Sequence, residues 1–203
     1  MAAVILAAGA SQRMGRPKLL LPWDGTTVLG QLLRQWQPAH QIGVVTAASN
    51  NALLAELKHC GFPSSGVILN PSPERGMFSS IQCAAAWSGW RNDITHWAIV
   101  LGDQPHLRPT TLESLRQFAA AHPEQVCQPA RSGHHRHPVI LPKNIFLQLP
   151  DSKAPHLKAF LESLPEKPVL CEINDPGLEL DIDRPKDYQK ALSLWHLACS
   201  KSY

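Results

Sequence analysis

The sequence lacks paired cysteines, a long apolar run and a basic leader. Its five cysteines are an odd number, lie far apart and form no C-x-x-C pair, so they indicate neither a zinc site nor a redox couple. No apolar stretch approaches the roughly 20 residues of a membrane helix, and the first apolar run leads directly into a polar loop. We therefore expect reduced, mostly packed cysteines in a cytoplasmic protein that does not bind a membrane.

A strong excess of one charge is also absent. The net charge of +3 is too small and too scattered along the chain to indicate nucleic-acid binding. Hydrophobic residues make up 44% and charged residues 17%, which is ordinary for a globular protein and argues against disorder. A chain of 203 residues can bury a full core, so we expect a single domain over residues 1–203 that binds a small anionic ligand.

Short apolar runs alternate along the chain with stretches of helical periodicity. Strands are expected over residues 2–6, 42–46, 67–69, 96–101, 126–129, 137–141 and 169–173. Helices are expected over 28–36, 51–60, 81–87, 110–121, 157–164 and 185–196. Thr26 or Thr27 can cap the first, Ser79 or Ser80 can cap or begin the third, and Thr110 or Thr111 can cap the fourth. The alternation predicts a three-layer, Rossmann-like α/β fold: a mostly parallel sheet with helices on both faces and a small β-ribbon insertion around residues 131–137.

The loop after the first strand is rich in cations and small residues. Arg13, Arg16 and Lys18 follow small residues whose backbone N–H groups can approach an anion, and Gly9 and Gly15 permit positive φ. The spacing is neither a Walker loop nor a dinucleotide fingerprint, because five residues separate the two glycines and no G-x-G-x-x-G occurs. On these grounds a triphosphate site and a solvated strand-to-helix turn both remain open.

Two acidic motifs could supply the opposite half of such a site. Asp103 lies in Gly102-Asp103-Gln104-Pro105, at the carboxyl end of the strand over 96–101, where a carboxylate suits Mg²⁺ but also an ordinary turn. Asp181 and Asp183 alternate with an isoleucine, so an extended chain places both carboxylates on one face. Two acids on one face suggest a bound cation, although Asp183 could equally cap the helix that begins at Pro185.

The ribbon tip carries three histidines at positions 134, 135 and 137. They could bind a metal ion, but no acidic or cysteine partner stands at ligand spacing, and exposed loop residues are the favoured interpretation. A role for this ribbon in gripping an acceptor substrate fits better.

Together the motifs resemble those of the nucleotidyltransferases related to the molybdenum cofactor enzymes. That family has Leu-Ala-Ala-Gly or Leu-Ala-Gly-Gly, then Arg-Met-Gly and a lysine, matched here by Leu6 to Gly9, by Arg13-Met14-Gly15 and by Lys18. Gly102 to Pro105 resembles its magnesium motif, and residues 181–187 resemble its usual ending. The Ala-Ala-Gly form and Gln104 are most similar to the cytidylyltransferase branch. The chain departs from the family pattern at Arg136, at residues 151–155 and at Arg184.

The resemblance implies Mg²⁺-dependent transfer of CMP from CTP to the molybdenum cofactor (molybdopterin), with release of pyrophosphate. It assigns catalysis to Arg13, Lys18 and Asp103, and Mg²⁺ binding to Asp103, Asp183 and Asp181. It assigns nucleotide binding to Leu6, Ala7, Ala8, Gly9, Arg13, Gly15, Lys18 and Asp103, and Asn70 and Ser80, which follow the third strand, are our candidates for the base or ribose. Arg136, His137 and Lys153 are candidates for acceptor contact.

Two alternatives stay open at this point. The acceptor could be another phosphorylated small molecule, such as a sugar or alcohol phosphate, because a fold shared by many enzymes does not select the acceptor. The protein could instead be a chaperone that carries the molybdenum cofactor without turning over nucleotide, although Lys18 and Asp103 argue against a mere carrier. In either role, a molybdoenzyme could receive the product.

Overall fold

The structure, a computed structural model, describes residues 1–9 and 11–200. Its strands are β1 (Ala2–Leu6), β2 (Pro22–Trp23), β3 (Thr26–Thr27), β4 (Gln41–Ala47), β5 (Val67–Asn70), β6 (His96–Leu101), β7 (Cys127–Arg131), β8 (His134–His135), β9 (Val139–Pro142) and β10 (Val169–Glu172). Its α-helices are α1 (Val28–Trp36), α2 (Asn51–His59), α3 (Met77–Ala86), α4 (Pro109–Ala121), α5 (Lys143–Phe146), α6 (Leu157–Ser163) and α7 (Pro185–Cys199).

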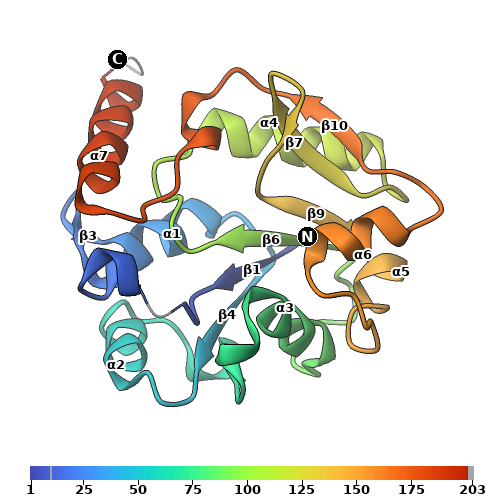
Figure 1. Ribbon diagram of the computed structural model, residues 1–203, viewed down its shortest axis with the longest axis horizontal. Coiled ribbons are helices and arrows are strands. Elements are labelled where there is room, and N and C mark those ends of the chain that lie inside the picture. The colour runs from blue at the N-terminus through green and yellow to red at the C-terminus, as the bar shows by residue number, and fades with distance from the viewer. Residues whose placement is uncertain (10, 201–203) are drawn as a thin grey trace.

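One sheet runs through the molecule in the order β10-β7-β9-β6-β1-β4-β5, with β8 paired to β7 (Figure 1). Strands β6, β1, β4 and β5 are parallel to their neighbours in that order, and β10 is parallel to β7, whereas β9 and β8 run antiparallel to their partners. Leu6 lies opposite both Val45 and Leu101. Because these strands are in register, the loops that follow β1, β4 and β6 leave the sheet side by side. The predicted Rossmann-like α/β fold is confirmed.

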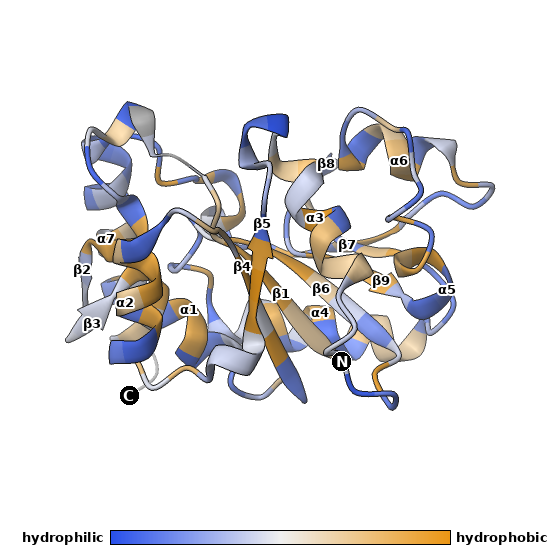
Figure 2. Ribbon diagram, turned by 90° about the horizontal axis from the view of Figure 1, so that it is seen from below, coloured by the Kyte–Doolittle hydropathy of each residue, from blue (hydrophilic) through white to orange (hydrophobic). Residues whose placement is uncertain are grey.

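Helices cover both faces of the sheet, and β1 supplies alternate residues to the two cores (Figures 1 and 2). Ala3, Ile5 and Ala7 belong to the core that includes residues of α1, α2, α4 and α7, whereas Ala2, Val4 and Leu6 belong to the core with α3, α5 and α6. Residues 2–7 are buried, with at most 8% exposed, because the strand is covered on both sides. Burial of apolar surface, at roughly 25 cal/mol per Å² removed from water, is the main favourable contribution to the free energy of folding.

Several local expectations are wrong. Helix α3 begins at Met77, after Gly76 with φ of 91°, so of the two alternatives Ser79 and Ser80 do not cap the helix but lie in its first turn. Helix α4 begins at Pro109, so Thr110 and Thr111 are also inside the helix. Thr27 does cap α1, where its hydroxyl accepts a hydrogen bond from the Gly30 N–H.

Two short elements were not expected from the sequence. Strands β2 and β3 form an antiparallel hairpin that packs beside α7, where Trp195 donates a hydrogen bond to Asp24 and the Tyr188 hydroxyl donates one to the Pro22 carbonyl. Helix α5 is a single turn that ends at the buried Phe146, whose ring stacks on that of Trp97. All five cysteines are free, and in the described part of the chain no helix is long and apolar enough to cross a membrane.

Candidate functional site

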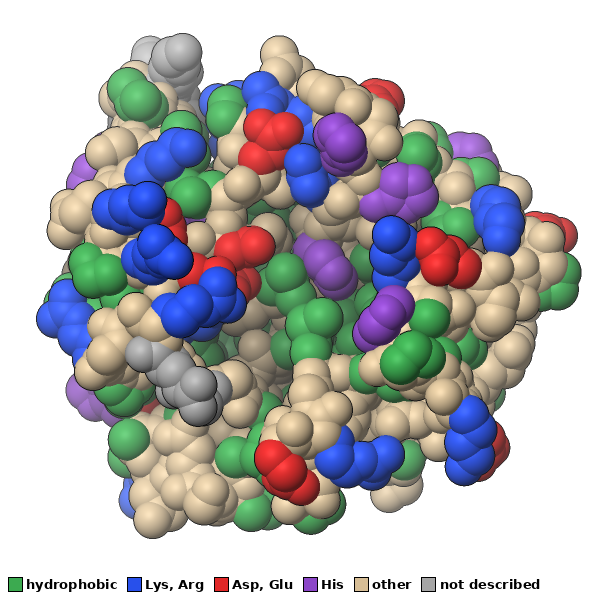
Figure 3. Space-filling model, viewed as in Figure 1, with side chains coloured by type: hydrophobic (Ala, Val, Ile, Leu, Met, Phe, Trp, Pro, Cys, Tyr) green, Lys and Arg blue, Asp and Glu red, His purple; other side chains and the backbone are tan. Residues whose placement is uncertain are grey.

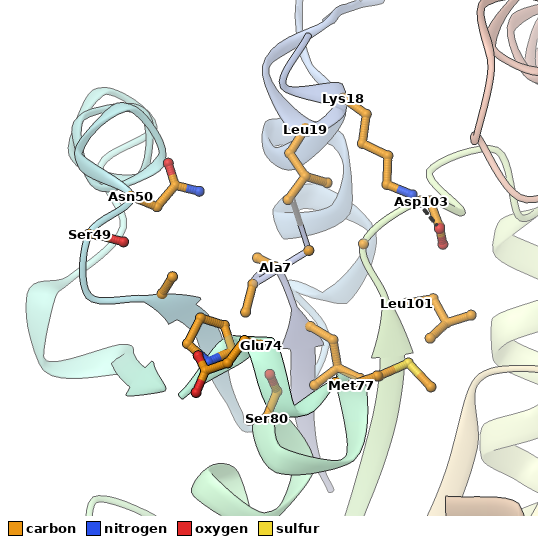
Figure 4. A pocket seen from close by; sticks show the side chains of 17 residues that line it. Ala7, Lys18, Leu19, Ser49, Asn50, Glu74, Met77, Ser80, Leu101 and Asp103 are labelled. Carbon is orange, nitrogen blue, oxygen red and sulfur yellow. Dashed lines mark hydrogen bonds and ion pairs between the residues drawn. The ribbon is translucent and has the colours of Figure 1, made fainter. Parts of the chain in front are cut away.

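A cavity of about 710 Å³ opens at the carboxyl ends of the central parallel strands. Its walls come from the loops after β1, β4, β5 and β6, and Figure 4 shows Lys18 and Asp103 on one side, Ser49 and Asn50 opposite, and Met77 and Ser80 below. Ligands of open parallel α/β sheets bind at this edge, because the backbone groups and loops that follow the strands converge there.

The Lys18 side chain crosses from the first loop to the end of β6. The Lys18 backbone N–H donates a hydrogen bond to the Ser11 hydroxyl at 3.1 Å, and the neighbouring Leu19 is buried in the core. The short 3₁₀ helix Lys18–Leu20 is therefore held against the sheet. From there the ammonium Nζ reaches Asp103 Oδ2 at 2.6 Å (Figure 4). Both side chains are largely buried, with 16% and 18% exposed, which strengthens their attraction relative to a surface pair.

Gly102 permits this approach between the two loops. A Cβ added there would lie 2.6 Å from the Leu6 carbonyl oxygen and 3.1 Å from Leu19 Cδ2. Any side chain would therefore push the Asp103 loop away from β1. Elsewhere in the first loop, Gly15 and Ser11 have positive φ, at 68° and 50°, so of the two glycines that permit it Gly15 uses this freedom.

The carboxyl-terminal acids reach the same place from the other end of the chain. The Ile182 N–H donates to the Asp103 carbonyl at 3.2 Å, which brings the segment 180–183 alongside the loop after β6. Asp183 Oδ2 lies 2.8 Å from Arg13, and its Oδ1 lies 3.6 Å from Lys18 Nζ. Asp183 does not cap α7, because Arg184 occupies the cap position and its N–H donates to Asp187.

Asp181 is exposed, whereas Asp183 is half-buried. Partial desolvation of the Asp181 carboxyl, followed by the nearby negative charge of Asp103, raises its pKa, and a 2.9 Å hydrogen bond from the Gln104 amide opposes this shift. Asp103 Oδ1 is buried and has no hydrogen-bond partner among the described residues. A buried carboxylate oxygen without a donor is a position that a metal ion would satisfy.

No group of three or more metal-ligating side chains gathers anywhere in residues 1–9 and 11–200. His134 and His135 are exposed, and His135 contacts the Gln128 carboxamide at 3.1 Å. His137 is half-buried, and burial lowers its pKa, partly offset by its contact with the Ile99 carbonyl. The ribbon histidines therefore form no metal centre in this structure.

The predicted nucleotide residues divide into two groups. Leu6, Ala7, Ala8, Gly9, Lys18, Ser80 and Asp103 line the 710 Å³ cavity, whereas Arg13, Gly15 and Asn70 do not. The Asn70 side chain is 1% exposed and is used within its own loop: Nδ2 donates to the Ser79 and Ser80 hydroxyls at 2.9 and 3.0 Å, and Oδ1 accepts from the Ser72 N–H. Asn70 thus positions Ser80 in the cavity wall.

A second cavity, of about 970 Å³, adjoins the first at Met77, which lines both. Figure 3 shows a hollow near the centre of this face, with mixed acidic and basic side chains on one rim and histidines with basic side chains on the other. Among the charged or titratable side chains that line this second cavity, one is acidic, Glu162, and the others are His134, His135, Arg136, His137, His156, Lys158 and Lys167. Lys153 is not among them and lines a separate cavity of about 600 Å³.

Arg136 is held by a carboxylate from the segment that leads to Asp181. Glu179 forms ion pairs with both Arg131 and Arg136, the latter at 3.4 Å, and so joins the β7–β8 ribbon to the segment leading to Asp181. Sequence reasoning missed this residue, because no local pattern marks a contact over 43 positions. It also missed Ser49 and Asn50, although their position after the strand over 42–46 was a usable signal, because ligand loops follow parallel strands.

A Rossmann-like sheet with a cationic loop facing carboxylates across the strand ends is the arrangement that the sequence predicted for a nucleotidyltransferase. The model of the MobA-like NTP transferase domain family matches residues 3–168, so the chain belongs to that family. It is 26% identical over 187 residues to the molybdenum cofactor cytidylyltransferase of Escherichia coli (strain K12), covering 91% of this chain and 92% of the relative.

Solved structures share the whole fold. The crystal structure of Rv0371c from Mycobacterium tuberculosis H37Rv matches with a TM-score of 0.72 and 26% identity over 95% of this chain and 97% of that one. A structure of the same protein in complex with manganese matches with a TM-score of 0.67 and 24% identity over the same shares.

Proposed function

We propose that this nucleotidyltransferase transfers CMP from CTP to the molybdenum cofactor and uses Mg²⁺. The observation that carries the proposal is the meeting of Lys18 with Asp103, at 2.6 Å, in the wall of a cavity made by four strand-end loops. The Escherichia coli relative supports the choice of reaction, as does the Ala7-Ala8-Gly9 form of the first motif.

In this reaction a phosphate oxygen of the acceptor attacks the α-phosphorus of CTP. The new oxygen–phosphorus bond forms as the bond from the α-phosphorus to its bridging oxygen breaks, and that electron pair leaves with pyrophosphate. No covalent intermediate with the protein is needed, so the protein chiefly positions groups and stabilises charge. Lys18 binds phosphate oxygens from the cavity wall, and the exposed Arg13, which pairs with Asp183, stabilises the departing pyrophosphate.

The acids suit a divalent metal ion. Asp103 offers a buried oxygen with no donor among the described residues, and Asp183 adds a second carboxylate, 3.6 Å from Lys18 Nζ. Mg²⁺ is commonly bound by one or two carboxylates together with substrate phosphates, so a cage of three protein ligands is not required. When bound, the metal supplies positive charge to phosphate oxygens. The manganese complex of the Mycobacterium tuberculosis relative supports a divalent ion here.

The ion pairs at the site must exchange partners when substrate binds. Lys18 and Arg13 now neutralise Asp103 and Asp183. A triphosphate attracts the two cations, and a divalent ion attracts the two acids. Either ligand alone would leave charged side chains without their partners, whereas nucleotide and metal together give each of the four side chains a new partner. We therefore assign tight nucleotide binding to the metal complex of CTP.

For the acceptor we assign the 970 Å³ cavity that meets the nucleotide cavity at Met77. Arg136 and His137 remain acceptor candidates because they line it, whereas Lys153 lies outside it. Its basic lining fits an acceptor that carries phosphate.

The deciding experiment measures pyrophosphate release from each of the four NTPs, with and without molybdenum cofactor, in Mg²⁺ and in EDTA. The proposal expects release with CTP only when Mg²⁺ and the acceptor are both present. Release with GTP alone would refute the nucleotide assignment. Activity on a sugar or alcohol phosphate, and none on the molybdenum cofactor, would show that the acceptor assignment is wrong. Tight cofactor binding without release under any condition would favour a carrier.

A further inference from the structure

We infer that Gln104 is a positioning residue that holds the acidic side of the site and does not select the nucleotide base. The inference rests on the proposed metal site at Asp103. Gln104 directly follows Asp103 but is absent from the lining of the nucleotide cavity. It is 5% exposed, and its Nε2 donates a hydrogen bond to Asp181 Oδ1 at 2.9 Å.

The geometry explains why an amide is useful at this position. Asp181 lies close to Asp103 because the N–H of Ile182, the next residue in the chain, donates a hydrogen bond to the Asp103 carbonyl. Two carboxylates at such a place repel each other, and a neutral donor reduces the repulsion without competing with a bound cation. An apolar side chain such as methionine would leave Asp181 without this donor, and a glutamate would add a third negative charge.

The backbone around Gln104 is held by other contacts. Behind the site, His106 Nε2 contacts the Gly177 carbonyl at 3.1 Å, and Asp175 Oδ2 accepts from the Thr111 hydroxyl at 2.7 Å and from the Arg108 N–H at 3.2 Å. These contacts join the segments 106–111 and 175–177 independently of Gln104. Replacing the Gln104 amide therefore changes the orientation of the acids without detaching the segment.

The consequence for function is specific. The Asp183 N–H donates to the Asp181 carbonyl at 3.0 Å, so a tight turn joins the two acids, and a displaced Asp181 also shifts the carboxylate that faces Lys18 and Arg13. Residues that orient metal-binding groups typically change metal affinity by about 10- to 100-fold when they are replaced. Gln104 should thus act on metal affinity, while the choice between CTP and GTP stays unchanged.

The test uses the full chain and measures Mn²⁺ binding by electron paramagnetic resonance, with CTP and with GTP, in the absence of any acceptor. Gln104→Met should weaken Mn²⁺ binding about 10- to 100-fold and leave the ratio of the CTP and GTP affinities as it was. Gln41→Met is the matched control. The Gln41 amide also joins two segments, since it binds the backbone of Gly89 and Arg91, but it stands at the amino end of β4, away from the cavity at the carboxyl ends of the strands.

A double-variant cycle separates positioning from a general loss of structure. If Gln104 acts through Asp181, Gln104→Met should change Mn²⁺ affinity little once Asp181→Asn is present, whereas independent effects would add. Unchanged Mn²⁺ affinity in Gln104→Met, additive losses in the cycle, or a shifted CTP-to-GTP ratio would each overturn the inference. Failure of the unaltered protein to bind Mn²⁺ with nucleotide would instead refute the proposed metal site on which it rests.

Discussion

Replacing Asp103 by asparagine should separate catalysis from nucleotide binding. The change keeps the size of the side chain but removes the charge that holds Lys18 Nζ at 2.6 Å. We expect the variant to lose Mg²⁺-dependent pyrophosphate release and, at the same time, to bind metal-free CTP more tightly than the unaltered protein. The two effects have opposite signs because Asp103 would bind the metal ion but compete with the triphosphate for Lys18.

The size of the gain follows from the ion pair. Two unit charges 2.6 Å apart attract by about 6 kcal/mol at an effective dielectric constant of about 20. Desolvation offsets much of this, and the net value of a hydrogen bond between charged groups is about 1.5–3 kcal/mol. Asp183 still faces Lys18 at 3.6 Å after the change, so the lower end of that range applies. Freeing Lys18 should therefore tighten metal-free CTP binding about tenfold.

Isothermal titration calorimetry in EDTA measures this affinity directly. Asp93→Asn is the control: it makes the same chemical change in an exposed pair with Arg91, whose side chains are 57% and 61% exposed, and should leave CTP binding unchanged. Equal or weaker metal-free binding in Asp103→Asn would contradict the exchange of partners. Undiminished Mg²⁺-dependent turnover would remove Asp103 from the metal site.

Three further results are expected. Lys18→Ala should lower turnover by about two to three orders of magnitude, as for a group that stabilises transferred charge, and a mild effect in a pyrophosphate-release assay would argue for a solvated lysine. Gly102→Ala should destabilise the fold by about 1–3 kcal/mol and reduce turnover further, because the new Cβ meets the Leu6 carbonyl at 2.6 Å; urea unfolding and kinetics test both. Burial lowers the pKa of His106 and His137 below the usual 6.5, so the unfolded chain takes up protons first on acidification. The free energy of unfolding should therefore fall between about pH 7 and pH 5, and equal urea midpoints at the two ends would contradict this.

Much of the fold could be predicted because its signals are local. The expected strands over 2–6 and 96–101 and the expected helix over 28–36 are present. A strand buried on both faces reads as a short apolar run, and a helix buried along one stripe reads as apolar residues three or four positions apart. Helix starts were less predictable. Ser79 and Thr111 are good capping residues, yet their hydroxyls donate to other groups. The Ser79 hydroxyl contacts the Gly76 and Ser72 carbonyls, and the Thr111 hydroxyl donates to the Asp175 carboxylate.

The sequence by itself determined the family, the individual strands and the residues at the strand ends, because motif spacing and periodicity are properties of neighbouring positions. Only the tertiary structure decided which distant groups meet. Asp103 faces Lys18 across 85 positions, and Gln104 holds Asp181 across 77. Such pairs depend on strand order and register, which bring separate loops to one edge, and no local pattern of residues contains that information.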